Sequence, residues 1–322
     1  MAQVTPDAAV LAGAVLVAVG LDRAFGEPPV RVHPVVLMGH YLGVVGRRVS
    51  RVAGATARPG AEFWGGAWGW FVGVALVVSV AAGLVAGVQT VHPLAQALLL
   101  GVLLKPLFAW RMLRDEVQAV EAALASSLAE GRARLTWLVS RDVTILDAAQ
   151  VRESASETLA ENLNDSVVAP LFWFAVAGLP GAALYRFANT ADAMWGYRGE
   201  RQGRDWTWAG KWAARADDVL SWVPARLTAL LLAGLGAVVR WRQVRAQARL
   251  TPSPNSGWPM AAMALALDVH LAKPGVYTLH PAGRSPQAAD TARALKLAGR
   301  VVGALAGLAA GVLVVGLWGQ AA

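Results

Sequence analysis

The sequence predicts an all-α protein that crosses a membrane several times. Of its 322 residues, 56% are hydrophobic and only 16% are charged, whereas a soluble domain usually carries about 25% charged residues. The apolar residues are also gathered in long runs rather than in short amphipathic stripes. Because a helix rises about 1.5 Å per residue, about 20 such residues span a hydrocarbon core of about 30 Å. We therefore expect a polytopic integral membrane protein of four to six spans, forming a single membrane-embedded domain over residues 1–322.

Six stretches are apolar enough to be candidate spans. In chain order they are 8–21, 67–91, 93–110, 167–185, 219–239 and 301–319. The first is short, and two of the others each contain one basic residue, Lys105 or Arg226. A charge at the middle of a membrane helix costs about 2.5–3.5 kcal/mol on insertion scales. Both side chains are therefore expected to reach the membrane surface or to face protein.

The stretch 167–185 is expected to be broken or re-entrant. It begins near Pro170 and contains Pro180. Proline removes a helical hydrogen-bond donor, and such breaks are tolerated at membrane depth where protein or a cavity surrounds them. A re-entrant segment places the polar stretches 111–166 and 186–218 on one side of the membrane, whereas six full spans place them on opposite sides. The sequence leaves both topologies open.

Most of the charge lies in four polar stretches, which are 22–62, 111–166, 186–218 and 240–300. The second is predicted to be helical, because Val117, Val120 and Leu124 recur at helical spacing. The net charge of +8 is expected to mark loops on the cytoplasmic side of the cell (inner) membrane rather than a nucleic-acid partner. The absence of cysteine excludes disulfides, iron–sulfur clusters and thiolate catalysis.

The densest group of acidic residues is a row at four-residue spacing. Glu153, Glu157, Glu161 and Asp165 fall on one face of a helix, and Asn162 lies beside them. Stacked like charges destabilise a helix by a few tenths of a kcal/mol unless a cation or a basic ligand lies against them. Magnesium is usually held by one or two carboxylates together with substrate phosphates. Glu157, Glu161 and Asp165 are thus candidate metal ligands, and a solvated acidic face is the alternative.

Arginine and acidic side chains gather in two further segments. The candidates between residues 185 and 206 are Asn189, Asp192, Tyr197, Arg198, Glu200 and Arg201. Arg215, Asp217 and Asp218 stand at the mouth of the next span. Arginine binds phosphate or carboxylate through two parallel hydrogen bonds, and nearby acids orient it or hold a metal. For the second segment, simple capping at the membrane surface is the alternative.

A turn rich in proline and serine precedes the helical run after residue 257. Asn255 and Gly257 lie in it, so backbone N–H groups could face an anion, or the turn could be an ordinary helix start. No P-loop, GxSxG, HExxH or GxGxxG motif occurs. The five histidines show no metal-ligand spacing, and His33 is predicted to be structural.

Taken together, these segments resemble the CobD/CbiB family of cobalamin-biosynthesis membrane proteins, the adenosylcobinamide-phosphate synthases. The resemblance runs from about residue 21 to residue 277. Its segments are LDRAFGEPP-VRVHPVVLMG, SRD, ESASETLAENLNDSVVAPLFW, NTADAMWGYRGER, ARADDVLSWVPARLTALL and SPNSGWPMAAMALAL. Each segment alone is weakly specific, but six in the same order with compatible spacing are a strong signal.

The resemblance implies an ATP-dependent amide ligase that joins the carboxylate of adenosylcobyric acid to (R)-1-amino-2-propanol or its O-phosphate. ATP and Mg²⁺ would serve as co-substrate and metal, an acyl phosphate as intermediate by analogy with other carboxylate–amine ligases, and no prosthetic group is expected. Other cobalamin-pathway enzymes and the lipid bilayer are implied partners. The implied catalytic residues are Glu157, Glu161, Asp165, Asp217 and Asp218. The implied substrate-binding residues are Asn162, Asn189, Asp192, Tyr197, Arg198, Glu200, Arg201, Arg215, Asn255 and Gly257.

The sequence departs from the family pattern near its C-terminal motif. Met260 stands where glutamate is usual, and Ala272 and Lys273 replace a glycine pair. Two other functions stay open. A corrinoid transporter is one, because polar residues beside broken spans also mark transport paths, although no inverted repeat is visible. A non-catalytic membrane accessory protein of the AmpE type is the other, and the retained acidic and arginine motifs argue against it.

Overall fold

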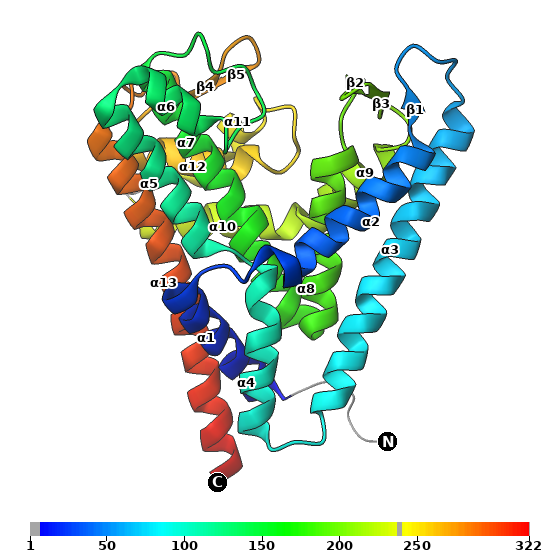
Figure 1. Cartoon of the computed structure of the whole chain (residues 1–322). Helices are drawn as coiled ribbons and strands as arrows, with labels where there is room; N and C mark the ends of the chain where they lie inside the picture. The colour runs from blue at the N-terminus through cyan, green and yellow to red at the C-terminus, as the bar shows by residue number, and fades with distance from the viewer. Residues whose placement is uncertain (1–6, 237–239, 322) are drawn as a thin grey trace. The chain divides into compact units, whose positions relative to one another are not determined.

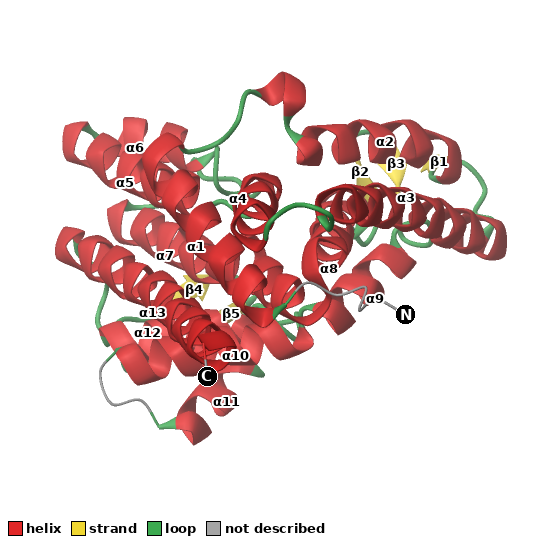
Figure 2. Cartoon of the chain, turned by 90° about the horizontal axis from the view of Figure 1, so that it is seen from below, coloured by secondary structure: helices red, strands yellow, loops and turns green. Residues whose placement is uncertain are grey.

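The computed structural model describes residues 7–236 and 240–321, and these residues are almost entirely helical (Figures 1 and 2). The predicted all-α class is therefore confirmed. The end of the predicted span 219–239 lies outside the described residues. The chain folds as two compact units. Unit 1 comprises Met1–Phe108, Ala169–Leu220 and Leu308–Ala322, and unit 2 comprises Ala109–Val168 and Ser221–Gly307.

Unit 1 is built around the long helices α3 and α8. Its elements are α1 (Ala8–Phe25), η1 (Val30–Val32), α2 (Pro34–Val49), β1 (Arg51–Val52), α3 (Pro59–Val88), α4 (Pro93–Leu104), η2 (Lys105–Leu107), α8 (Ala169–Trp195), β2 (Glu200–Arg201), β3 (Arg204–Asp205) and α9 (Lys211–Leu220). Helix α1 packs on α4, while α2, α3 and α9 pack on α8. The three short strands form an antiparallel sheet in the order β1-β3-β2.

Unit 2 is a bundle that carries one small hairpin. Its elements are α5 (Trp110–Ser126), α6 (Leu128–Leu135), α7 (Ala148–Leu163), the π-helical turn η3 (Asn164–Val168), α10 (Trp222–Leu235), α11 (Trp241–Ala248), α12 (Gly257–Leu267), β4 (Leu271–Lys273) and β5 (Tyr277–Leu279). Helix α12 packs on α7, α10 and α11. The last helix, α13 (Ala288–Ala321), contributes residues to both units. Helix α5 confirms the helix predicted from the spacing of Val117 and Val120, which are both buried.

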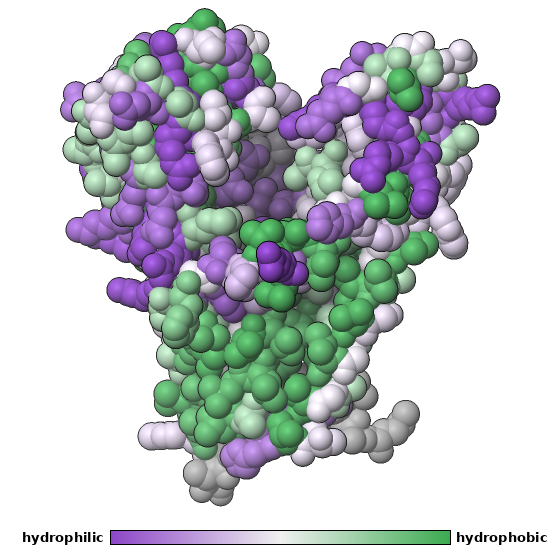
Figure 3. Space-filling view, viewed as in Figure 1, coloured by the Kyte–Doolittle hydropathy of each residue, from purple (hydrophilic) through white to green (hydrophobic). Residues whose placement is uncertain are grey.

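Within residues 7–236 and 240–321, five helical segments are long and apolar enough to cross a membrane. They are Ala8–Phe25, Pro59–Val88, Pro93–Ser126, Ala148–Trp195 and Ala288–Trp318. Helices α9 and α10, which follow one another in the chain, make a sixth if they are taken as one span. Each of the six overlaps one predicted stretch. Figure 3 shows hydrophobic residues gathered over α4 and the part of α3 nearest to it, as a lipid-facing surface requires.

The predicted break in the fourth span lies at Ala177 and Gly178. Both residues leave the helical conformation, and Gly178 adopts a φ of 61° and a ψ of −156°, a region open essentially to glycine alone. Pro180 follows two residues later and supplies no backbone donor to the preceding turn. The prediction of a broken segment is therefore confirmed, with the break just before the proline.

Helix starts are fixed by side chains that cap them. Asp147 and Gln150 form a reciprocal capping box at the start of α7. His33 accepts a hydrogen bond from the backbone of Val35 at 3.2 Å, and its other ring nitrogen lies 3.1 Å from Glu27. The interpretation of His33 as a structural residue is confirmed.

Lys105 sits in a buried network of charges in unit 1. Its ammonium group lies 3.1 Å from Asp22 and 2.9 Å from Glu27, and its side chain is only 7% exposed. Burial alone would raise the pKa of Glu27, but hydrogen bonds from His33 and Lys105 outweigh burial and hold that pKa below its usual value. Lys105 therefore faces protein, as its position in an apolar stretch predicts.

Candidate functional site

The acidic row lies on α7 in unit 2, and its first members are buried. Glu153 and Glu157 are 3% and 2% exposed. Buried carboxylates are costly unless they are paired or hydrogen-bonded, so the alternative of a solvated acidic face is wrong for these two residues. Glu161 follows one turn later on the same helix and is half-buried.

Side chains from outside α7 converge on the row. His270 lies 3.2 Å from Glu153 Oε1, and the backbone N–H of Ala272 donates to Glu153 Oε2 at 2.8 Å. Arg141 donates to Glu157 Oε2 at 2.6 Å. The first two partners belong to the segment at β4, whereas Arg141 lies in the loop before α7. The buried carboxylates of Glu153 and Glu157 are thus held by contacts from two separate segments of the chain.

Two buried atoms of this cluster keep unused hydrogen-bonding capacity. Glu157 Oε1 and Arg141 Nη1 are buried, and neither makes a hydrogen bond of good geometry, although the Tyr277 hydroxyl lies beside the Glu157 carboxylate. A buried acceptor next to a buried cationic donor suits a ligand that carries a metal ion and an anionic oxygen. In the described part of the chain, no three histidine or acidic side chains lie close enough together to hold a metal ion unaided. Such an ion would therefore need ligand oxygens from a substrate, as magnesium commonly does.

Tyr277 on β5 adds a hydroxyl to the cluster. Burial raises the pKa of Tyr277, and the charge of Glu157 raises it further, so the phenol stays protonated and remains a donor. Its hydroxyl donates to the sulfur of Met260 at 3.8 Å. Met260, at the position where the family usually has glutamate, is therefore buried within the same cluster.

Asp165 does not continue the α-helical row, because it stands in the π-helical turn η3. A π-helical turn rotates the following residue away from the i, i+4 register, and such turns are frequent at functional sites. Asn164 donates to the Asp165 carboxylate at 2.7 Å. Asp165 and Glu161 still interact electrostatically, and Lys273 and Arg141 are the cations that act on Glu161.

Asn162 and the turn before α12 are held by internal bonds. Asn162 donates to the Thr158 carbonyl at 3.1 Å. Asn255 accepts a hydrogen bond from Arg226 at 2.6 Å. Arg226, the basic residue of the predicted span 219–239, therefore faces protein. The backbone N–H groups of Asn255 and Ser256 donate to Ser253, at 3.2 and 3.1 Å, so these two donors are engaged within the turn. At Gly257 a Cβ would lie 2.3 Å from Thr251 Oγ1, so the turn requires glycine there.

A second cluster, in unit 1, surrounds a pocket of about 330 Å³ between α9 and the segment after α8. The pocket is lined by Gly196, Tyr197, Arg198, Thr207, Lys211, Ala214, Arg215 and Asp218. The structure thus brings together four predicted residues and adds Thr207 and Lys211. Asp218 lies 3.8 Å from Arg215 and also interacts with Arg198. Three cations around one carboxylate give the pocket an excess of positive charge, which favours an anionic ligand.

Other predicted residues of unit 1 do not line the pocket, but they contact residues that line it or adjoin it in the chain. Asn189 donates to Asp217 at 3.4 Å, which joins α8 to α9. Asp192 packs against Gly196, where a Cβ would come within 2.0 Å of its carboxylate. Arg201 stacks on Tyr197, with its guanidinium carbon 3.7 Å from the ring centroid.

Glu200 is another predicted residue of unit 1, but its hydrogen bond is to a loop and not to a residue of the pocket. It lies on β2 and accepts a hydrogen bond from the backbone of Gly54 at 3.2 Å, so it ties the sheet to the loop after β1. It does not line the pocket.

The sequence pattern did not predict a role in the site for six residues of the two clusters. They are Arg141, Thr207, Lys211, His270, Lys273 and Tyr277. All lie in loops, in short strands or at a helix end, where no periodicity marks them. The resemblance alone pointed to Arg141, through the SRD segment, and it extended as far as Tyr277.

Comparisons with known proteins agree on one family. A family model described as CobD/Cbib protein matches residues 15–298. The chain is 42% identical over 274 residues to the "Probable cobalamin biosynthesis protein CobD" of Pyrococcus abyssi, covering 85% of this chain and 87% of that protein. It is 41% identical over 294 residues to the "Cobalamin biosynthesis protein CobD" of Chromobacterium violaceum, covering 88% and 91%. No solved structure matches the chain.

Proposed function

The chain belongs to the CobD/CbiB family of cobalamin biosynthesis proteins, and from that membership we propose that it is an ATP-dependent amide ligase. It joins the carboxylate of adenosylcobyric acid to (R)-1-amino-2-propanol or its O-phosphate and gives adenosylcobinamide or its phosphate. The observation that carries the proposal is the buried Glu157–Arg141 pair, in which one carboxylate oxygen and one guanidinium nitrogen make no hydrogen bond of good geometry.

The chemistry requires activation of a carboxylate. An amine does not displace oxide from a carboxylate, so the corrinoid oxygen first attacks the γ-phosphorus of ATP, the bond to the β,γ-bridging oxygen breaks, ADP leaves, and an acyl phosphate forms. The amine then attacks the acyl carbon, and phosphate leaves. Glu157, Glu161 and Asp165 would help to hold magnesium, which would supply positive charge against the phosphates.

Residues of the chain supply the remaining parts of the site in unit 2. Arg141 offers Nη1 as a buried donor to a phosphate oxygen, and Lys273 adds a second cation near Glu161. Charge-assisted bonds of this kind are about twice as strong as neutral ones. Tyr277, which stays protonated, offers a hydroxyl to an anionic oxygen.

The cationic pocket of unit 1 is proposed to bind an anionic group of a substrate. Arg198, Lys211 and Arg215 line it, and its volume of about 330 Å³ accommodates a phosphate or a corrinoid carboxylate with its first substituents. Asp217 and Asp218 would orient these cations. The location that fits this role is the cell (inner) membrane, with corrinoid, aminopropanol and other enzymes of the pathway as partners.

One observation favours a second candidate function, transport of a corrinoid. The break at Ala177 and Gly178 lies inside an apolar helix, and broken helices in transporters hold substrate at membrane depth. Uptake of corrinoid into sealed vesicles by a protein that forms no amide would support transport.

The test of the ligase is reconstitution from defined components. Detergent-purified protein is incubated with adenosylcobyric acid, aminopropanol phosphate, ATP and Mg²⁺, and corrinoid mass and released phosphate are followed. The ligase requires all four components and releases phosphate in step with amide. Folded protein that binds corrinoid yet forms no amide with either amine would overturn the proposal.

A further inference from the structure

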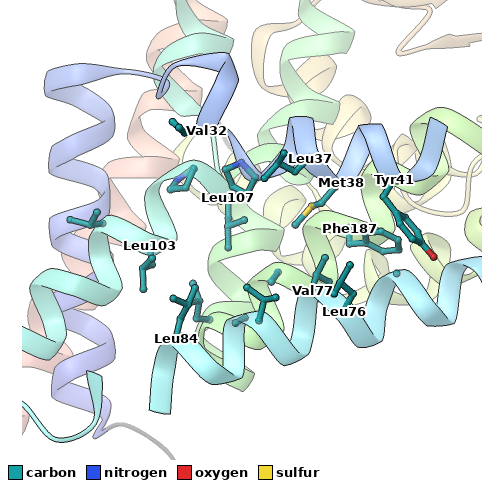
Figure 4. Close-up of a pocket in the computed structure, with 18 residues that line it drawn as sticks. Val32, Leu37, Met38, Tyr41, Leu76, Val77, Leu84, Leu103, Leu107 and Phe187 are labelled. Carbon is teal, nitrogen blue, oxygen red and sulfur yellow. The ribbon is translucent and has the colours of Figure 1, made fainter. Parts of the chain in front are cut away.

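Unit 1 contains an apolar groove that the ligase proposal does not use. Its volume is about 450 Å³, and α2, α3, α4 and α8 line it (Figure 4). The only polar side chain among the described residues that line it is Tyr41, whose hydroxyl donates to the Gly69 carbonyl at 2.8 Å. Because that one hydroxyl is already bonded, the groove offers nothing to water and suits a purely apolar occupant.

The groove runs along a helix that is long enough to cross the membrane. Its residues on α3 extend from Gly73 through Val77 and Val80 to Leu84. At about 1.5 Å per residue, these eleven steps cover about 16 Å along the helix axis. Since α3 is a candidate span, the groove follows the direction in which lipid acyl chains lie.

A free cation stands beside the groove. Val32 lines it, and the preceding residue, Arg31, is exposed on η1. Within the described chain, Arg31 makes no ion pair or side-chain hydrogen bond, in contrast to the buried Lys105 of η2, which is paired with Asp22 and Glu27. Val30 and Val32 on either side of it are also largely exposed. Apolar side chains flanking an arginine are typical of a segment at the membrane surface.

We infer that the groove binds one acyl chain of a membrane phospholipid, whose phosphate lies against Arg31. The acyl chain explains an apolar channel that follows a membrane-spanning helix. The phosphate explains the unpaired guanidinium beside it, because arginine binds phosphate through two parallel hydrogen bonds. The bound lipid fills space between α3 and α4 that protein side chains leave open.

The first test fills the groove on α3. Val80 lines the groove and is 55% exposed, whereas Val72, on the same helix, does not line it and is 43% exposed. Protein is exchanged extensively into lipid-free detergent, and retained phospholipid is counted by native mass spectrometry. We expect wild type and Val72→Trp to retain one phospholipid per chain, and Val80→Trp to lose at least five-sixths of it. Equal retention by all three proteins would show surface lipid only and overturn the inference.

The second test addresses the phosphate. Delipidated protein is offered a mixture of phosphatidylglycerol and diacylglycerol, which share acyl chains and differ in the phosphate. Wild type and Arg48→Gln, which alters another exposed arginine of unit 1, should retain phosphatidylglycerol at least fivefold over diacylglycerol, and Arg31→Gln should lose most of that preference. A groove that takes up both lipids equally in wild type, or that takes up corrinoid substrate instead of lipid, contradicts the assignment.

Discussion

At the scale of single residues, Glu157 and Glu161 differ in how far a substitution would disturb folding as well as activity. Glu157 is paired with Arg141, so removing its charge leaves a buried guanidinium without a partner, which costs about 3–5 kcal/mol. A loss of activity in such a variant would be confounded by loss of folding. Glu161 makes no direct ion pair in the described chain and lies on the same helix face. It therefore reports on function more cleanly.

We predict that Glu161→Gln and Asp218→Asn each lower amide formation at least about 100-fold, the size typical of losing a group that stabilises charge at a reacting centre. Both changes keep side-chain volume, so expression and membrane insertion should be unchanged. The measurement is the rate of amide formation at saturating substrates, with Glu130→Gln on the exposed face of α6 as control. Near-normal turnover in both variants would remove these residues from the active site.

Tyr277 gives a prediction for the pH dependence of stability. Its pKa is raised above the usual 10.0 because burial and Glu157 disfavour the phenolate. The folded state then keeps the proton that the unfolded chain releases near pH 10. Its contribution to stability is complete below about pH 10 and is lost as pH rises further. We expect the melting temperature of wild type to fall more between pH 9 and pH 11 than that of Tyr277→Phe. Parallel melting curves would show that the hydroxyl is solvated.

At the scale of the elements, the break in α8 and the caps of the other helices are local consequences of sequence. Gly178 adopts a backbone conformation open essentially to glycine alone, and Pro180 lacks the N–H that a continuous helix would need. The π-helical turn η3 has no comparable signal, because none of its residues is a glycine or a proline. It is stabilised instead by a tertiary bond between Thr228 and Asn164, at 3.1 Å.

We predict that Gly178→Ala destabilises the protein by about 1–3 kcal/mol, the usual cost of a side chain in a sparsely populated backbone region. Gly83→Ala is the matched control, because it lies inside α3 with no atom near its missing Cβ. That change should stabilise by up to about 1 kcal/mol through helix propensity. Thermal unfolding in detergent measures both. A neutral Gly178→Ala would mean that the helix continues through this position.

The network around Lys105 joins the end of α1 to η2. We predict that Lys105→Met destabilises the protein by about 3–5 kcal/mol, because Asp22 and Glu27 lose their shared cation. The triple change Asp22→Asn, Glu27→Gln, Lys105→Met should recover much of that loss, and Lys296→Met, on the exposed side of α13, should cost little. If the single and triple variants melted together, the pairing would contribute nothing.

At the scale of the whole molecule, the membrane helices were predictable and most of the site was not. Long apolar runs identify a span by themselves, so each of the six predicted stretches overlaps an observed candidate span. Glu153, Glu157 and Glu161 were predictable as a row because they share one helix. Their partners were not, because Arg141 and His270 reach α7 from segments 16 and 117 residues away in the chain, and such contacts leave no periodic trace.

The same limit applies to the cationic pocket of unit 1. Tyr197, Arg198, Arg215 and Asp218 were predicted from charge density, but Lys211 is the sort of lone surface lysine that sequence alone does not distinguish. Glu200 was included on resemblance and density, and it bonds to a neighbouring loop instead of lining the pocket. Whether a side chain lines the pocket depends on its burial and on the direction in which it points, and both are properties of the folded chain.

The most direct measurement follows oxygen from the corrinoid carboxylate. Adenosylcobyric acid labelled with ¹⁸O in its reacting carboxylate is incubated with purified protein, aminopropanol phosphate, ATP and Mg²⁺, and both the amide and the released phosphate are analysed by mass spectrometry. An amide ligase that works through an acyl phosphate leaves one ¹⁸O in the inorganic phosphate for each amide formed. Amide accompanied by unlabelled phosphate, or no amide from folded protein that binds its substrates, would contradict the proposed function.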